Sequence, residues 1–208
     1  MNILNNFIVI EGIDGAGTTT QCKLLNAGIK NSVFTCEPTP GVIGKMIREI
    51  LSGSVKVDKH TLALLFASDR SDHMYGVNGI SKISDAHTII CDRYILSSYA
   101  YQSLDVDDDF IISINSSFPI PAITFFIDTD VEECCRRVDT RKEKEIYEIK
   151  ELQYKIREKY RIGIQKFKSI GHTIIEIDGN KSVEEINEDI LSFFKINQFP
   201  VDKRGEII

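Results

Sequence analysis

The sequence lacks the features that define several protein classes. Only five of its 208 residues are proline and 42% are hydrophobic, so we expect a folded chain with a full core rather than disorder. Lysine and arginine number 25 against 31 acids, which gives a formal net charge of −6. Because binding to nucleic acid or an anionic membrane needs a basic face, neither partner is expected. A polyanionic ligand would have to meet locally clustered cations.

Cysteines and long apolar runs are also few. The five cysteines are odd in number and form no CxxC pair, which argues against a disulfide framework or zinc site and favours reduced thiols. No run approaches the roughly 20 apolar residues of a membrane span, and the N-terminus lacks a basic region followed by a long apolar stretch. A cytoplasmic protein is therefore expected.

Short runs rich in Ile, Val, Phe and Thr alternate with longer helical stretches, a pattern typical of a parallel sheet with crossover helices. The predicted strands are 7–11, 32–36, 87–92, 122–128 and 173–178. The predicted helices are 19–30, 42–51, 59–75, 95–103, 108–116, 131–138, 147–170 and 183–196. No repeat or linker divides the chain, so one domain is predicted over 1–208, with a tail at about 198–208.

The stretch "EGIDGAGTTTQ", residues 11–21, nearly matches a phosphate-binding P-loop. Gly12 and Gly17 have the required spacing and Thr19 supplies the hydroxyl for Mg²⁺, but Thr18 stands where a lysine is expected. Such a glycine turn lets backbone N–H groups converge on phosphate, and the helix that follows adds its positive end. The predicted ATP- and phosphate-binding residues are Gly12, Ile13, Asp14, Gly15, Ala16, Gly17, Thr18, Thr19 and Thr20.

A basic segment could supply the missing charge. "RRVDTRKEK", residues 136–144, holds five cations against two acids. Such a run, seen alone, is usually a solvated helix face. Because it follows the fourth predicted strand, it is interpreted as a lid, at about 137–147, that closes over transferring phosphates. The candidates to replace the lysine are Arg137, Arg141, Lys142 and Lys144.

The stretch "CDRYILSSYAYQ", residues 91–102, places a charged pair at the carboxyl end of a predicted strand, where ligands gather in open parallel sheets. Arg93 could grip a phosphate and Asp92 could orient Mg²⁺-bound water. The alternative is a structural Asp–Arg pair that caps the next helix.

The stretch "LFASDRSDH", residues 65–73, places Phe66 and Arg70 on one helix face, four residues apart. This spacing offers a ring to stack on a base and a guanidinium to donate to a base carbonyl. Taken alone, the pattern is better explained by a core phenylalanine and by an arginine paired with Asp69 or Asp72.

Together with "FTCEPTPGVIGKMIREIL" and "EIYEIKELQYKIREKY", these motifs resemble thymidylate kinase over about residues 7–195. "DRYxxSSxAYQ" is the most specific of them. The resemblance implies an α/β fold: a P-loop three-layer sandwich with a five-stranded parallel sheet, helices on both faces and a short basic lid, usually as a homodimer. It also implies transfer of the γ-phosphoryl group of ATP to dTMP, with Mg²⁺, in dTTP synthesis.

The resemblance also implies roles for single residues. Phe66 would stack on thymine, Tyr101 would lie beneath the deoxyribose, and Arg93 would hold the acceptor phosphate. Glu37 and Arg48 resemble a pair that shapes the acceptor pocket. The implied substrate-binding set is Asp14, Glu37, Arg48, Phe66, Arg70, Arg93, Ser98, Tyr101 and Gln102. The implied catalytic set is Asp14, Asp92, Arg93, Arg137 and Arg141, with Thr19 and Asp92 at the metal.

Three departures from the family pattern each remove a cation. Thr18 stands in place of the P-loop lysine, and Cys36 and Ile146 each stand in place of an arginine. Bacterial-type members carry catalytic basic residues on the lid, and Gly15 fits that type. Two alternatives stay open, a kinase for another nucleoside monophosphate and a catalytically weak nucleotide-binding homologue. Arg70 as a donor suits thymine O4, whereas a cytosine amino group would set two donors against each other.

Overall fold

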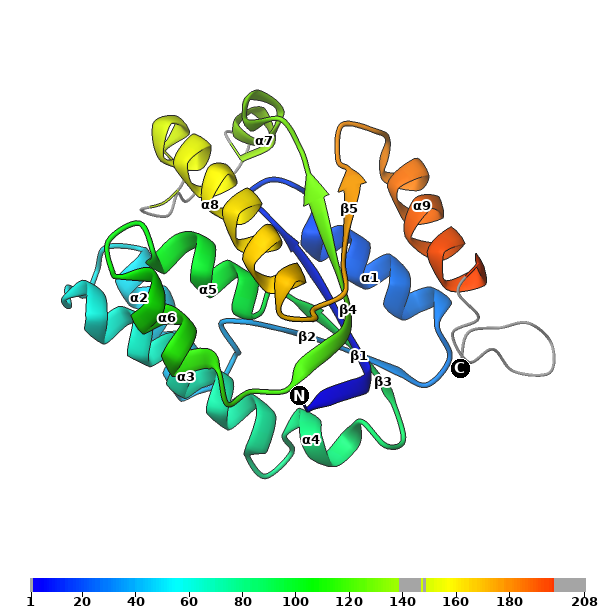
Figure 1. Ribbon diagram of the computed structural model, residues 1–208, viewed down its shortest axis with the longest axis horizontal. Helices are drawn as coiled ribbons and strands as arrows, with labels where there is room; N and C mark the ends of the chain where they lie inside the picture. Colours follow the sequence, from blue (N-terminus) through cyan, green and yellow to red (C-terminus); the bar gives the residue numbers. More distant parts are fainter. Residues whose placement is uncertain (1, 139–146, 148, 197–208) are drawn as a thin grey trace.

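The computed structural model describes residues 2–138, 147 and 149–196. Five parallel strands form one sheet: β1 (Ile3–Gly12), β2 (Ser32–Cys36), β3 (Thr88–Asp92), β4 (Ile120–Asp128) and β5 (Ile174–Asp178). Their order is β2-β3-β1-β4-β5 (Figure 1). All five predicted strands are confirmed. β1 begins earlier than predicted, because Ile3 and Leu4 pair with Ile120 and Pro121 before a register shift.

The helices among the described residues are α1 (Thr18–Gly28), α2 (Val42–Leu51), α3 (Lys59–Tyr75), α4 (Ile80–Ile83), α5 (Ile95–Gln102), α6 (Asp108–Asn115), α7 (Val131–Val138), α8 (Lys150–Ser169) and α9 (Val183–Ile196). The eight predicted helices are confirmed. The short helix α4 was not predicted, and α8 begins at Lys150 rather than Tyr147. Most of the predicted lid, 139–146, and the tail from 197 lie outside the described residues.

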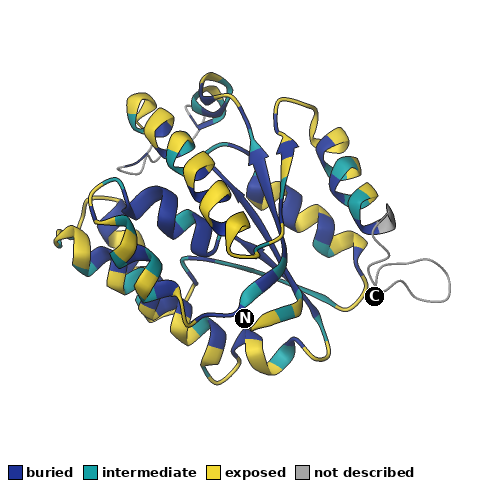
Figure 2. Cartoon of the chain, in the orientation of Figure 1, coloured by how far each residue is buried: buried dark blue, intermediate teal, exposed yellow. Residues whose placement is uncertain are grey.

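Helices cover both faces of the sheet. Helices α1 and α9 lie on one face and α5 and α8 on the other (Figure 1). Strand β3, most of β4 and the second half of β1 are buried, whereas β2 is half-buried, β5 is mixed and the outer helix faces are exposed (Figure 2). Phe7, Val9 and Ile10 of β1 have no exposed surface. Burial on both faces explains why these strands are apolar without alternation. No helix of the described residues is long and apolar enough to cross a membrane.

The carboxyl ends of three strands meet at one edge of the sheet. Asp92, the last residue of β3, pairs in register with Cys36 of β2 and with Ile10 of β1. The loop after Gly12, the segment after Cys36 and Arg93 therefore start side by side. This edge is where open parallel sheets bind their ligands.

Candidate active site

A cleft of about 460 Å³ opens at this edge of the sheet. All nine predicted substrate-binding residues line it, together with Asp92 and most of the predicted phosphate-binding loop. Gly12, Ile13 and Ala16 do not line the cleft. Ile13 and Ala16 are buried beneath the loop and form its turn, in which the Ala16 N–H donates to the Ile13 carbonyl at 3.1 Å. Their predicted part in phosphate binding stays a prediction.

The loop has the strand, turn and helix setting that the sequence predicts. Gly15 and Gly17 adopt φ values of 91° and 94°, which residues other than glycine rarely adopt. A Cβ on Gly15 would also lie 2.5 Å from the carbonyl oxygen of Cys134 in α7. Helix α1 begins at Thr18, lines the cleft with its first turn and has no acidic residue there. The N–H groups of this first turn can therefore donate to an anion, and no acidic side chain of the turn itself opposes it.

Thr19 and Asp92 come together at the floor of the cleft. The Thr19 hydroxyl donates to Asp92 Oδ2. Asp92 is 6% exposed, and its Oδ1 is buried with no hydrogen-bond partner among the described residues. A carboxylate oxygen without a partner beside a hydroxyl suits Mg²⁺, which takes few protein oxygens and shares the rest of its shell with water and phosphate. No group of three or more His, Cys, Asp or Glu in the described ranges could hold a metal alone.

Arg93 is held in an unusual conformation. Its φ is 69°, an uncommon value outside glycine, and such backbone strain clusters at functional sites. Its guanidinium donates to Asp14 Oδ1 at 2.7 Å, to the Gly12 carbonyl at 2.8 Å and to the Tyr101 hydroxyl at 3.1 Å. Arg93 is thus tied to the phosphate loop. The predicted alternative, in which Asp92 and Arg93 pair and cap α5, is not formed.

The cap of α5 comes instead from Glu11, which the sequence reasoning missed. Glu11 has no exposed surface and accepts the backbone N–H groups of Tyr94 at 2.9 Å and Ser97 at 3.1 Å. The Tyr160 hydroxyl of α8 donates to the same carboxylate at 3.1 Å. Burial raises the pKa of Glu11, although the hydrogen bonds from Ser97 and Tyr94 and the nearby charge of Arg93 oppose the shift. Glu11 therefore fixes α5, which carries three predicted substrate residues, to the end of β1.

Gln153 links α8 to the phosphate loop and was also missed. Its side chain is buried, and its Nε2 donates to Asp14 Oδ2 at 3.0 Å and to the Tyr147 carbonyl at 2.7 Å. The Tyr147 ring lines the cleft and meets the Tyr101 ring edge-on, with centroids 5.3 Å apart. Burial raises the pKa of Tyr147 to about 12. Asp14 thus accepts from both Arg93 and Gln153.

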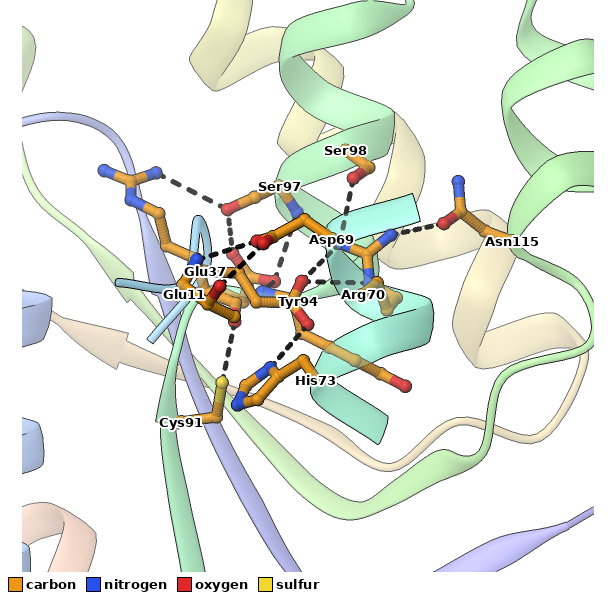
Figure 3. A network of polar contacts seen from close by, with 12 residues as sticks. Glu11, Glu37, Asp69, Arg70, His73, Cys91, Tyr94, Ser97, Ser98 and Asn115 are labelled. Carbon is orange, nitrogen blue, oxygen red and sulfur yellow. Dashed lines mark hydrogen bonds and ion pairs between the residues drawn. The ribbon is translucent and has the colours of Figure 1, made fainter. Parts of the chain in front are cut away.

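Arg70 occupies the centre of a buried polar network (Figure 3). Its Nε and Nη2 donate to Glu37 Oε2 at 2.9 and 2.7 Å, its Nη2 also donates to Ser98 at 3.0 Å, and its Nη1 donates to Asn115. The pairing with Asp69 or Asp72 considered from the sequence is wrong. Asp69 instead accepts from the backbone N–H and the hydroxyl of Thr39.

Glu37 and Arg48, expected as a pair, both line the cleft but are not bonded to each other. Arg48 donates to the carbonyl oxygens of Pro38 and Thr39, the latter with its Nη1 at 2.5 Å. Glu37 turns toward α3, where it accepts from Arg70 and bonds His73 Nδ1 at 3.0 Å. Both side chains thus line the cleft through separate contacts, and their shared role in shaping the acceptor pocket stays a prediction.

Two more predicted residues, Phe66 and Gln102, line the cleft together with Arg70. Phe66 is half-buried and lines the cleft from α3. Gln102 is 4% exposed, and its Oε1 is buried without a hydrogen-bond partner in the described part of the chain. Because a buried amide oxygen without a partner is costly, it marks a position where a ligand donor would be stabilised.

Arg137 lies at the rim of the phosphate loop. Its Nη1 donates to the Gly15 carbonyl at 3.4 Å, and its Nε donates to Glu133 at 2.8 Å. The hydrogen bonds from Arg136 and Arg137 lower the pKa of Glu133 to about 2. Arg141, Lys142, Lys144 and Ile146 lie outside the described residues.

Residues 10–190 match the family model for thymidylate kinase. The chain belongs to the thymidylate kinase family. It is 44% identical over 192 residues to the probable thymidylate kinase of Methanococcus aeolicus, covering 90% of this chain and 95% of that protein. It is also 44% identical over 210 residues to the probable thymidylate kinase of Methanococcus maripaludis strain C6, covering 99% and 100%.

Among solved structures, the thymidylate kinase of Candida albicans superposes with a TM-score of 0.77 at 25% identity, and the match covers 92% of each chain. The predicted P-loop fold with a five-stranded parallel sheet is thereby confirmed. Membership of the thymidylate kinase family makes the chain an ATP-dependent nucleoside monophosphate kinase. The sequence resemblance to this family is confirmed as well.

Proposed function

We propose that this protein transfers the γ-phosphoryl group of ATP to dTMP, giving dTDP for dTTP synthesis. The observation that carries the proposal is the joining of two sites in one cleft. Thr18 to Thr20 of the phosphate loop line this cleft, and Phe66, Arg70 and Gln102, which would hold the base, line it as well. Family membership supports the same reaction.

The base site suits thymine by its hydrogen-bond pattern. Arg70 has five N–H donors, and its contacts to Glu37, Ser98 and Asn115 leave one on Nη1 for a base carbonyl. Gln102 Oε1 can accept the N3–H of thymine, and Phe66 can stack on the ring. Cytosine would present an amino group to Arg70, at a cost of about 1–3 kcal/mol.

The phosphate end suits in-line transfer between two polyanions. Arg93 is positioned to hold the acceptor phosphate, with Asp14 fixing its guanidinium. Thr19 and Asp92 would hold Mg²⁺, which when bound supplies positive charge to the phosphate oxygens. Such a reaction needs placement and charge stabilisation more than covalent chemistry from the protein.

Lid cations are proposed to compensate for the missing P-loop lysine. The contact of Arg137 with the Gly15 carbonyl supports this, because it brings one such cation to the loop. Turnover should be measured for single alanine changes at Arg137, Arg141, Lys142 and Lys144. A loss of more than a few-fold at one or more positions supports the hypothesis, and it fails if none shows such a loss.

We also propose a cytoplasmic homodimer formed by one domain, without nucleic-acid or membrane partners. Leu64 and Tyr75 on α3 are 47% and 48% exposed and offer apolar surface for a second copy. All five cysteines are free thiols, as suits a reducing compartment. Light scattering after size exclusion tests the dimer, and Leu64→Glu should shift it toward the monomer.

A coupled ADP-release assay with Mg-ATP tests the activity. Turnover with dTMP should exceed turnover with dUMP, dCMP and UMP. The comparison matters because the Candida enzyme is described as having broad substrate specificity. Faster turnover of another acceptor would favour the second kinase assignment. Binding of both nucleotides without any ADP release would favour the catalytically weak homologue.

A further inference from the structure

Four cations from the described residues line the cleft: Lys23, Arg48, Arg70 and Arg93. The three arginines are engaged by protein groups, namely backbone carbonyls for Arg48, the Glu37 network for Arg70 and Asp14 for Arg93. Lys23 differs from them. It is exposed, and its ammonium makes no hydrogen bond or ion pair with another described residue.

Lys23 is placed to reach the phosphate end of the cleft. It lies in α1 four residues after Thr19, so the two side chains share one face of the helix. The rise between them is about 6 Å. Helical side chains lean toward the N-terminus, and a lysine stem of about 6 Å spans that rise. The ammonium can therefore lie beside the Thr19 hydroxyl and its partner Asp92.

The same region is where the sequence has lost cations. The Thr18 side chain is uncharged and 6% exposed. Cys36, which replaces a family arginine, pairs in register with Asp92 and lines the cleft as Lys23 does. An incoming polyphosphate would thus meet the carboxylate of Asp92 with fewer fixed positive charges than the P-loop pattern provides.

We propose that Lys23 binds phosphoryl oxygens beside Thr19 and supplies, from the flank of α1, charge that the P-loop lysine would otherwise provide. Arg137 reaches the loop from α7, at the Gly15 carbonyl, so its contribution and that of Lys23 are separate. The inference rests on the proposed kinase function and deepens it.

Lys23→Gln tests the proposal against Lys45→Gln, a matched change of an exposed lysine in α2 that does not line the cleft. Because a charge-assisted contact is lost, kcat/KM for dTMP phosphorylation should fall about ten- to a hundredfold in Lys23→Gln. Lys45→Gln should stay within about twofold, as expected for a surface change. Lys23→Arg should keep most of the activity. Unchanged kcat/KM in Lys23→Gln overturns the proposal.

Restoring the P-loop lysine gives a second test. In a Thr18→Lys background, Lys23→Gln should cost less than about threefold, because the new ammonium serves the same oxygens. An equal cost in both backgrounds would show that Lys23 does not replace the P-loop lysine.

Equilibrium binding of Mg-ATP and of dTMP separates this inference from the kinase assignment. Lys23→Gln should weaken at least one of the two about tenfold, with unchanged circular dichroism. If the unmodified protein binds both but releases no ADP, the kinase function fails while Lys23 is still tested by binding. If binding and turnover are both unaffected in the variant, Lys23 has no phosphate role.

Discussion

The buried pair of Glu37 and Arg70 allows a sharp prediction for Glu37→Gln. The two side chains are 3% and 1% exposed and are joined by two hydrogen bonds of 2.7 and 2.9 Å. The change keeps the volume but removes the negative charge, so the guanidinium of Arg70 remains buried without an ionic partner. Breaking a buried pair in this way costs about 3–5 kcal/mol. That is a large part of a typical unfolding free energy of about 5–15 kcal/mol.

Urea unfolding without nucleotide measures this cost. With a slope of about 3 kcal/mol per molar, the midpoint should fall by about 1 M or more. The double variant Glu37→Leu with Arg70→Met removes both charges. Apolar replacement of a complete buried pair is often neutral. The double variant should therefore lose about 2 kcal/mol less unfolding free energy than the sum of the losses in Glu37→Leu and Arg70→Met measured singly.

Two results would refute this reasoning. A loss below about 1 kcal/mol for Glu37→Gln would mean that Arg70 finds other partners or water. Strict additivity of the single changes would mean that the pair is not energetically coupled.

Two further predictions concern other ties between elements. Gln153→Met removes the donor to Asp14, so KM for dTMP should rise about tenfold. The control is Gln21→Met, a change of another buried glutamine, which should lower the melting temperature and leave KM unaltered. The pKa of Asp108 is lowered because the hydrogen bond from Lys159 and its neighbours outweighs partial burial. This stabilisation is complete above the ordinary pKa of 3.8 and is lost as the pH falls below it, so the stability difference between wild type and Asp108→Asn should shrink from pH 6 to pH 3.

The strands could be predicted because burial on both faces leaves a continuous apolar run, which local sequence shows directly. The start of α9 shows in the sequence as a capping box, Ser182 with Glu185 three residues on, and the structure forms it: the Glu185 N–H donates to the Ser182 hydroxyl at 3.3 Å. Helix α4 was missed because four residues are too few to show a period. The start of α8 was misplaced because no side chain caps it.

The site was predictable only where residues adjoin a recognisable motif. Asp92 ends β3, Arg93 follows it, and Thr19 comes after the loop at the end of β1, so their meeting could be deduced from a parallel sheet. The partners of Glu11 are 83 to 149 residues away, and the Asp14 partner of Gln153 is 139 residues away. Local periodicity does not reveal contacts over such separations. Lys23 was missed because a single lysine on a helix is ordinarily a solvated residue.

The cap that Glu11 places on α5 has a consequence for redesign of the enzyme. The end of β1 leads directly into the glycine turn, and through the Glu11 carboxylate it also anchors α5, which carries three of the predicted substrate-binding residues. In the proposed reaction, the distance between ATP and dTMP would therefore be set by one strand rather than by two adjustable loops. Enlarging the acceptor pocket for bulkier nucleosides should therefore succeed through α3, at Phe66, and should fail through α5.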